Sequence, residues 1–221
     1  MKRRALLFDI DGTLADTDAL HVAAFNDVFG RYGHVFDRQR AANELLGRSN
    51  LSIGAQFLPD EPPERRAAVM AQKEEAFRAR AAGQVQAVAG LMTLLDYAQA
   101  EAVPVVAVTN APRANAEMIL HGLRIMHRFK AVIIGDELAH GKPHPMPYLE
   151  GLRAAGAVAE RAVAFEDSRA GIAAACAAGI ATVGLRTNLG HDELIAAGAV
   201  LTAQAFDEPD VFDLVRARLA A

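Results

Sequence analysis

The sequence predicts an α/β fold in which a doubly wound parallel sheet is interrupted by an all-helical insertion. Short apolar runs of strand length recur at 5–8, 103–108, 131–134, 162–165 and 181–185. Helical patterns separate most of these runs, and strands that alternate with helices favour a parallel sheet covered on both faces. Between residues 16 and 83 the alternation stops. We therefore expect a core formed by 1–15 and 84–221, with a helical domain at 16–83.

The first predicted strand is followed by Asp-Ile-Asp-Gly, which puts Asp9 and Asp11 where the chain leaves the sheet. Carboxylates are tolerated at the carboxyl edge of a parallel sheet, which opens on a crevice. Side chains two apart in an extended segment point the same way, so one carboxylate can attack while the other transfers a proton. The alternative is a turn in which Asp and Gly12 serve only backbone geometry.

The insertion carries helical periodicity without a convincing strand. Apolar residues predict a first helix over 20–29 and further helices that contain Leu45, Leu46, Ile53 and Phe57. A charged helix is expected to begin near Pro63 and run to about residue 82, because proline and acidic residues favour the first turn. Two short connections, near 15–17 and 82–88, join the insertion to the core and permit a hinge motion.

The second strand leads into Thr109 and Asn110, directly before a helix that begins near Pro112. The first amides of such a helix can bind an anion, and the Thr109 hydroxyl suits a phosphate oxygen. Thr and Asn are also common N-cap residues, so helix capping is the alternative interpretation.

Lys142 lies in a loop that Pro143 and Pro145 stiffen, which suits a fixed positive charge. The alternative is an ordinary surface lysine. His140 and His144 flank it, but no third residue nearby completes a metal-ligand set.

The strand at 162–165 is followed by Glu166 and Asp167, so two adjacent carboxylates precede the next helix. With Asp9 they offer the oxygen ligands that magnesium prefers. A solvated acidic turn is the alternative.

In a parallel sheet these polar segments meet at one edge, and together they supply a nucleophile, a proton carrier, a hydroxyl, a positive charge and a metal site. Those are the parts needed for phosphoryl transfer.

The composition excludes several classes of function. At 221 residues with 52% hydrophobic side chains, the chain can fill the core of a globular protein. A net charge of −4 with scattered Lys and Arg argues against nucleic-acid and membrane partners. Because Asp9 interrupts the apolar run after a basic start, we expect no signal peptide or membrane span, and a cytoplasmic location. The single cysteine, Cys176, is expected in the core without a disulfide.

With these residues assembled, the chain resembles the haloacid dehalogenase superfamily of phosphatases and phosphomutases over essentially its whole length. The segment from Phe8 to Thr13 is similar to the first family motif, Thr109 to the second, Lys142 to the third, and Glu166-Asp167-Ser168 to the fourth. The helical insertion resembles the family's cap domain.

The resemblance implies a mechanism. Asp9 would form an aspartyl-phosphate, and Asp11 would protonate the leaving oxygen and then deprotonate water. Thr109 and Lys142 would hold the phosphoryl oxygens. Magnesium would be bound by the Asp9 carboxylate, the Asp11 main-chain carbonyl, Asp167 and Glu166. Dehalogenases lack this metal, so the founding activity is not expected.

Within the superfamily the chain is similar to small sugar-phosphate phosphatases and the related β-phosphoglucomutases. That similarity implies that His21 lies near the acid/base, although a lone histidine on an amphipathic helix could equally be a surface residue. It also implies that Gly47, Arg48 and Asn110 help to bind substrate. A mutase has an arginine three positions after the glycine, where this chain has Asn50. Arg48 would have to reach from its shifted position.

The sequence is thus interpreted as a magnesium-dependent phosphatase of small sugar or polyol phosphate monoesters, acting beneath a mobile cap. A small phosphorylated substrate would be its partner, and we expect a monomer or a weak homodimer. A sugar phosphomutase and a catalytically silent phosphosugar-binding module are the alternatives. The cap shapes the substrate site, so the sequence does not name the sugar.

Overall fold

The computed structural model describes residues 3–220 and contains a six-stranded parallel sheet, ordered β3-β2-β1-β4-β5-β6. The strands are β1 (Ala5–Phe8), β2 (Val105–Thr109), β3 (Ala131–Ile134), β4 (Ala162–Glu166), β5 (Ala181–Leu185) and β6 (Leu201–Ala203). β1 lies at the centre, with Phe8 paired in register with Ala107 of β2 and Phe165 of β4. The predicted doubly wound parallel sheet is confirmed. The sequence prediction omitted β6, whose three residues are too short for a pattern.

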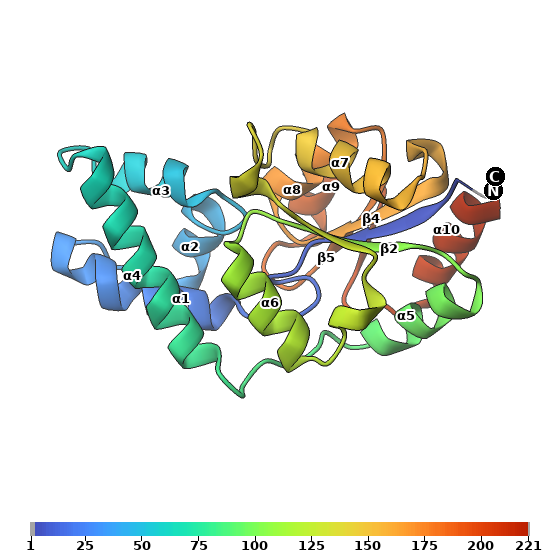
Figure 1. Ribbon diagram of the computed structural model, residues 1–221, viewed down its shortest axis with the longest axis horizontal. Helices are drawn as coiled ribbons and strands as arrows, with labels where there is room; N and C mark the ends of the chain where they lie inside the picture. Colours follow the sequence, from blue (N-terminus) through green and yellow to red (C-terminus); the bar gives the residue numbers. More distant parts are fainter. Residues whose placement is uncertain (1–2, 221) are drawn as a thin grey trace.

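Helices cover both faces of the sheet (Figure 1). On one face lie α7 (Met146–Ala155), α8 (Arg169–Ala177) and α9 (His191–Ala197), and on the other α5 (Leu91–Ala100), α6 (Arg113–Gly122) and α10 (Pro209–Ala220). Short 3₁₀ helices are η1 (Gly30–Tyr32), η2 (Met126–Arg128), η3 (Gly135–Glu137) and η4 (Ala159–Arg161). Successive strand residues point to opposite faces of the sheet, each of which packs in its own apolar layer. Leu7 packs on the α7–α8 side and Phe8 on the α5–α10 side.

Four helices form a separate lobe, at the left in Figure 1: α1 (Asp18–Phe29), α2 (Arg38–Glu44), α3 (Asn50–Phe57) and α4 (Pro63–Ala81). We call this lobe the helical insertion. An aromatic cluster of its own holds it together, with Phe29, Phe36 and Phe57 packed edge to face. Leu45 and Leu46, expected inside a helix, follow the end of α2, where Leu45 still packs in the cluster.

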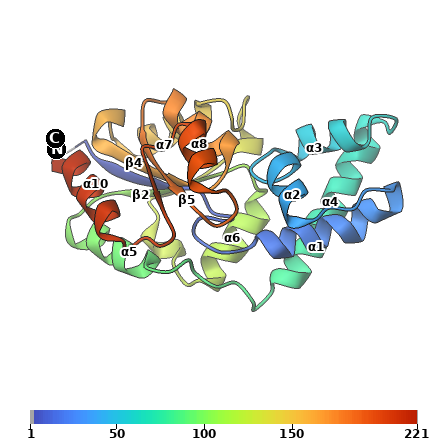
Figure 2. The same ribbon diagram turned by 180° about the vertical axis from the view of Figure 1, so that it is seen from behind.

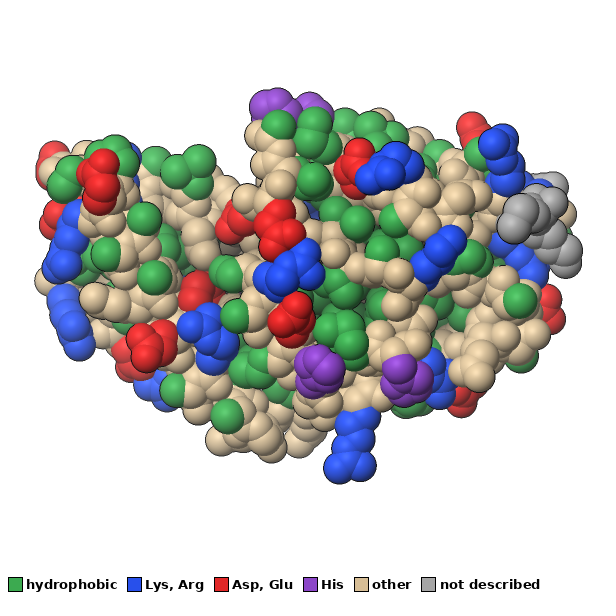
Figure 3. Space-filling view, in the orientation of Figure 1, with side chains coloured by type: hydrophobic (Ala, Val, Ile, Leu, Met, Phe, Trp, Pro, Cys, Tyr) green, Lys and Arg blue, Asp and Glu red, His purple; other side chains and the backbone are tan. Residues whose placement is uncertain are grey.

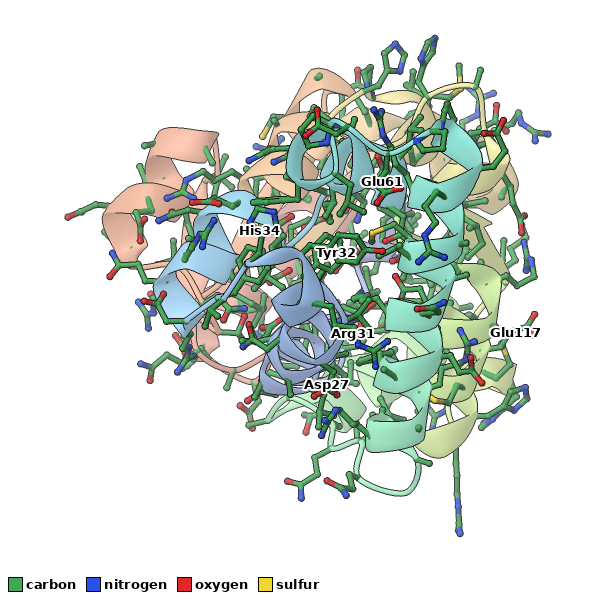
Figure 4. All side chains as sticks on the ribbon, turned by 90° about the vertical axis from the view of Figure 1, so that its left-hand side faces the viewer. Asp27, Arg31, Tyr32, His34, Glu61 and Glu117 are labelled. Carbon is green, nitrogen blue, oxygen red and sulfur yellow. The ribbon has the colours of Figure 1, made fainter. Side chains whose placement is uncertain are left out.

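The far end of the insertion is closed by contacts between the chain after α1 and the end of α3. In Figure 4 His34 points into the lobe, and its Nε2 lies 2.9 Å from the carbonyl oxygen of Phe57. From behind (Figure 2), α2 lies beside the core, where Asn43 accepts a 3.0 Å hydrogen bond from Arg169. The insertion therefore contacts the core through side chains as well as through its two connections.

The two connections are joined to each other. Ala15 forms a β-bridge with Ala87, and the Val88 amide donates to the Leu14 carbonyl at 3.0 Å. The start and the end of the insertion consequently leave the sheet at one place, next to Asp11, which also bridges to Ala15.

The prediction that Cys176 belongs to the core is only partly correct. Cys176 lies on α8, but it is only partly buried and its Sγ contacts the Gly198 carbonyl oxygen at 3.2 Å. It is a free thiol, in agreement with the absence of a predicted disulfide. Among residues 3–220 no helix is both long and apolar enough to cross a membrane. Met1 and Lys2, which belong to the basic start of the chain, lie outside the described residues.

Candidate active site

Asp9 continues the line of β1 into the site. Its amide donates to the Phe165 carbonyl at 3.0 Å, so the strand ladder fixes its position, and its side chain remains 11% exposed. At Gly12 the backbone turns with φ of +73°. A Cβ there would lie 2.2 Å from Oδ2 of Asp167, so glycine is required for both the turn and the approach of that carboxylate.

Lys142 reaches Asp9 from the opposite side of the site. Its Nζ donates to Asp9 Oδ1 and Glu166 Oε1, each at 2.5 Å, and to the Val108 carbonyl at 2.7 Å. Burial alone would lower the pKa of Lys142, but the two carboxylates outweigh it and raise that pKa. Burial raises the pKa of Asp9, and Lys142 only partly offsets it because Glu166 and Asp11 add repulsion.

Glu166 is fully buried, and its carboxylate accepts hydrogen bonds from three side chains. Besides Lys142, Tyr148 donates to it at 2.7 Å and Ser168 at 3.2 Å. Its carboxylate fills the space above Gly171, where a Cβ would lie 2.0 Å from it. Burial and the nearby Glu166 charge raise the pKa of Tyr148, which therefore stays a neutral donor. The hydrogen bond from Tyr148 depends on packing between α7 and β4, which the sequence pattern does not reveal.

Carboxylate oxygens of Asp9, Glu166 and Asp167 all lie within 4.8 Å of one another, and all three residues are buried. Burial, with the charges of Asp18, Asp9 and Glu166, raises the pKa of Asp167. Three buried carboxylates compensated by one lysine leave an excess of negative charge, which an added cation relieves. The donor set contains only oxygen and so fits a hard divalent cation such as Mg²⁺.

Asp11 belongs to a second hydrogen-bonded chain that runs into the insertion. Its Oδ1 accepts from the Thr17 hydroxyl at 2.8 Å and lies 3.0 Å from Nε2 of His21. Nδ1 of that histidine lies 3.1 Å from Nζ of Lys73, and its ring stacks on Phe77 at 3.7 Å. An ammonium only donates, so Nδ1 accepts and Nε2–H points at Asp11. Burial would raise the pKa of Asp11, but His21, Thr17 and Lys73 lower it overall.

The interior position of Lys73 was not predicted from the sequence. It is 3% exposed and pairs with Glu74 at 3.0 Å. In a charged helix its Lys-Glu-Glu context resembles a solvated face, and only its spacing from Phe77 on the same helix hinted at the inward orientation.

Thr109 and Asn110 stand at the end of β2, as predicted. Thr109 is 2% exposed and its Oγ1 accepts from the Ala111 amide at 2.9 Å. Asn110 donates to the carbonyls of Gly47 at 3.1 Å and Lys142 at 3.0 Å, and accepts from the Lys142 amide at 2.9 Å. These bonds use both amide hydrogens of Asn110, so its amide ties the insertion to the Lys142 loop.

One cavity of about 70 Å³ gathers the predicted residues. It is lined by nine of the ten, all but Glu166, which lies beneath it: Asp9, Asp11, His21, Gly47, Arg48, Thr109, Asn110, Lys142 and Asp167. Arg48 is held within the insertion, with Nη1 donating to the Glu44 carbonyl at 2.9 Å and to Gln56 at 2.5 Å. At Gly47 a Cβ would lie 2.4 Å from the Ser168 hydroxyl, so this glycine lets the insertion approach the core closely.

Comparisons with known proteins found similar sequences and a similar fold. The sequence pattern of the haloacid dehalogenase-like hydrolases matches residues 6–185. The fructose-1-phosphate phosphatase YqaB of Escherichia coli is 33% identical, over 82% of this chain and 95% of its own. A phosphorylated carbohydrates phosphatase of Thermotoga maritima is 30% identical, over 89% of this chain and 92% of its own. The solved structure of CbbY from Rhodobacter sphaeroides in complex with phosphate superimposes with a TM-score of 0.80 and 31% identity, covering 93% of this chain and 95% of that one.

Proposed function

The chain belongs to the haloacid dehalogenase-like hydrolase family, and from that premise we propose that it is a magnesium-dependent phosphatase of small sugar or polyol phosphate monoesters. The observation that carries the proposal is the single cavity in which Asp9, Asp11, Thr109 and Lys142 meet. Relatives named as phosphatases of fructose 1-phosphate and of phosphorylated carbohydrates support the sugar-phosphate class.

In the proposed reaction the Asp9 carboxylate attacks phosphorus while the bond from phosphorus to the alcohol oxygen breaks. Asp11 gives its proton to that oxygen, and an aspartyl-phosphate remains on Asp9. Asp11 then takes a proton from water, whose oxygen attacks the phosphorus while the bond from phosphorus to Asp9 breaks. Inorganic phosphate and the free Asp9 carboxylate result. The hydrogen bonds from Thr17 and His21 favour the Asp11 carboxylate, which is the form required for this second step.

Thr109 and Lys142 are proposed to hold the phosphoryl oxygens during both steps. Lys142 supplies a positive charge that its buried carboxylate neighbours keep protonated. The Thr109 hydroxyl adds a neutral donor at the start of α6. Fixed donors directed at developing charge are a large source of rate enhancement.

Asp9, Asp167 and the Asp11 main-chain carbonyl would hold the magnesium ion, with Glu166 directly behind them. When bound, the ion neutralises charge on the phosphoryl group and on the attacking carboxylate. Because Glu166 already accepts from Lys142, Tyr148 and Ser168, its main role in the proposal is to orient Lys142.

We assign substrate selection to a cap formed by residues 16–83, above a core formed by 1–15 and 84–221. The cap contributes His21, Gly47 and Arg48 to the lining of the cavity. The hydrogen bond from Asn110 to the Gly47 carbonyl holds this cap loop against the core. Asn50 lines the same cavity without a charge, and the guanidinium of Arg48 donates to the Glu44 carbonyl and to Gln56 within the insertion, which supports a phosphatase over a phosphomutase.

We also propose that the enzyme is cytoplasmic and acts as a monomer or weak homodimer on a small diffusible substrate. Its net charge of −4 is consistent with independence from nucleic acid.

Inorganic phosphate release from a panel of sugar phosphates, with magnesium and with EDTA, tests the proposal. We expect magnesium-dependent release from wild type and from Asp60→Asn, an exposed control, and a loss of about 10³-fold or more in Asp9→Asn. Magnesium-dependent release that persists in purified Asp9→Asn contradicts the nucleophile. Isomerisation of a sugar phosphate that needs a bisphosphate primer identifies a mutase, and binding without turnover identifies a silent module.

A further inference from the structure

A groove of about 500 Å³ lies between the helical insertion and the core, outside the catalytic cavity. Its walls come from α4, from the start of α3 and from Pro112, which precedes α6. Figure 4 shows α4 beside α6, the helix that carries Glu117. In Figure 3 the surface facing the viewer is hollowed between the two lobes.

The groove adjoins the catalytic cavity, and the two spaces share part of their lining. Asn50 and Glu74 line both spaces. Glu74 accepts from Asn115 of α6 at 2.7 Å, so this wall is a hydrogen-bonded contact between the insertion and the core. The groove therefore lies directly across this contact from the catalytic cavity.

The catalytic cavity and the groove differ in volume, and this difference bears on the size of the substrate that fits. The catalytic cavity, of about 70 Å³, suits a phosphoryl group and little more. The groove, at about 500 Å³, falls within the range of sites that bind whole organic molecules. The groove therefore offers the leaving alcohol of the substrate room beyond the cavity, along α4.

The groove combines an apolar surface with positive charge. Leu51 is 84% exposed there, beside Met70, Ala71 and Pro112. An exposed leucine at the edge of a groove is suited to contact an apolar group.

Two arginines, Arg66 and Arg78, line the same groove. Within residues 3–220 neither forms an ion pair: Arg66 donates to the carbonyls of Leu58 and Pro59, and Arg78 to Asn115. Glu74, the acidic residue of the groove, is already paired with Lys73. The groove therefore carries uncompensated positive charge, which favours an anionic ligand group.

We propose that this groove binds the leaving group of the substrate, and that the preferred substrate is a sugar phosphate whose far end carries an apolar group terminating in an anion. The proposal rests on the phosphatase function proposed above and specifies its substrate class. Arg78 would pair with the anion, and the surface formed by Leu51, Ala71 and Pro112 would contact the apolar part.

Three probes that share one reacting phosphate test this: glucose 6-phosphate, phenyl glucoside 6-phosphate and 4-carboxyphenyl glucoside 6-phosphate. We expect wild-type kcat/KM to rise along this series. Ala71→Trp, which fills the groove, should lower kcat/KM for both glycosides at least about tenfold more than for glucose 6-phosphate. Ala79→Trp is the matched control, because Ala79 is an exposed alanine on α4 that does not line the groove.

The charge is tested separately. Wild type should prefer the carboxyphenyl glucoside over the phenyl glucoside, and Arg78→Gln should lower this ratio of kcat/KM values about fivefold to tenfold, which removes the preference. Arg65→Gln, an exposed control on α4, should retain it. The natural chain has no tryptophan, so the Ala71→Trp fluorescence also reports where the new ring lies. Emission blue-shifted relative to Ala79→Trp indicates that the groove accepts an apolar ring.

The outcomes separate the two proposals. Wild type that hydrolyses none of the three esters, nor any other sugar phosphate, contradicts the phosphatase function and this inference with it. Wild type that hydrolyses all three with equal kcat/KM, or Ala71→Trp that changes all three alike while folded, overturns the groove assignment and leaves the phosphatase intact.

Discussion

Nζ of Lys142 lies 2.5 Å from Oδ1 of Asp9, and the same nitrogen lies 2.5 Å from Oε1 of Glu166. One buried ammonium thus compensates two buried carboxylates that come from adjacent strands. Removing it leaves both charges without their partner, and a buried charge without a partner is costly.

Lys142→Met should therefore lower the free energy of unfolding by about 3–5 kcal/mol at pH 7 in metal-free buffer, as measured by urea denaturation. Adding Glu166→Gln should recover part of this stability without restoring activity. The control is Lys130→Met, whose lysine donates only to the Ala155 carbonyl and whose loss should cost about 1 kcal/mol. Equal losses in the two single variants would show that the charge cluster does not matter for stability.

Magnesium binding should release protons. Burial, joined by neighbouring carboxylates, raises the pKa of both Asp9 and Asp167, so the metal-free site retains a proton that an ordinary carboxyl group loses. The metal binds the deprotonated form. Calorimetric titrations in two buffers of different ionisation enthalpy should reveal release of up to about one proton per ion near pH 6, decreasing as pH rises. A binding enthalpy that is identical in both buffers contradicts this prediction.

Asp18→Asn should stabilise the fold at neutral pH. Asp18 is 6% exposed, and its burial raises its pKa from 3.8 to about 6. The folded state therefore holds this proton more tightly than the unfolded state, so wild-type stability falls as pH rises from about 4 to about 6. At pH 7 the neutral variant should gain about 1–3 kcal/mol, and the gain should vanish below about pH 4.

Urea denaturation of Asp18→Asn across this pH range, in EDTA, measures the effect. Asp16→Asn serves as the control, since Asp16 is exposed in the same connection. A stability gain that does not depend on pH would point to a cause other than the ionisation of Asp18.

Gly12→Ala should weaken magnesium binding about tenfold or more, because its Cβ would displace the Asp167 carboxylate. Gly33→Ala is a matched control: Gly33 also has positive φ, at +80°, but a Cβ at that position would have no other atom within 4 Å. Both variants should lose about 1 kcal/mol of stability from the left-handed backbone. Only Gly12→Ala should lose affinity in a magnesium titration, and equal affinity in the two variants would refute the steric argument.

Much of the candidate site could be predicted because several of its residues end or follow an apolar strand. Asp9, Thr109 and Asp167 interrupt or follow buried runs, and the parallel sheet brings those strand ends to one edge. The order of the strands could not be derived, since local pattern does not record which strands are neighbours.

The residues that escaped prediction are those whose role depends on contacts between distant segments. Lys73 is buried because Phe25 of α1 and Phe77 surround it, and nothing local marks a lysine in a charged helix as interior. The hydrogen bond from Asn110 to the carbonyl of Gly47, 63 residues away, could not be read from either segment alone. Cys176 lies on the expected helix, but its partial exposure depends on how α9 packs against α8.

The hydrogen bond between Val88 and Leu14 has an evolutionary consequence. Because the insertion departs and returns at one point, a different helical segment with equally close ends can replace it without rerouting the strands. The proposed attacking carboxylate and the proposed recognition surface of the insertion are thus encoded in separable stretches of the gene. A lineage can acquire a new substrate by exchanging one contiguous stretch while the reaction chemistry is inherited unchanged.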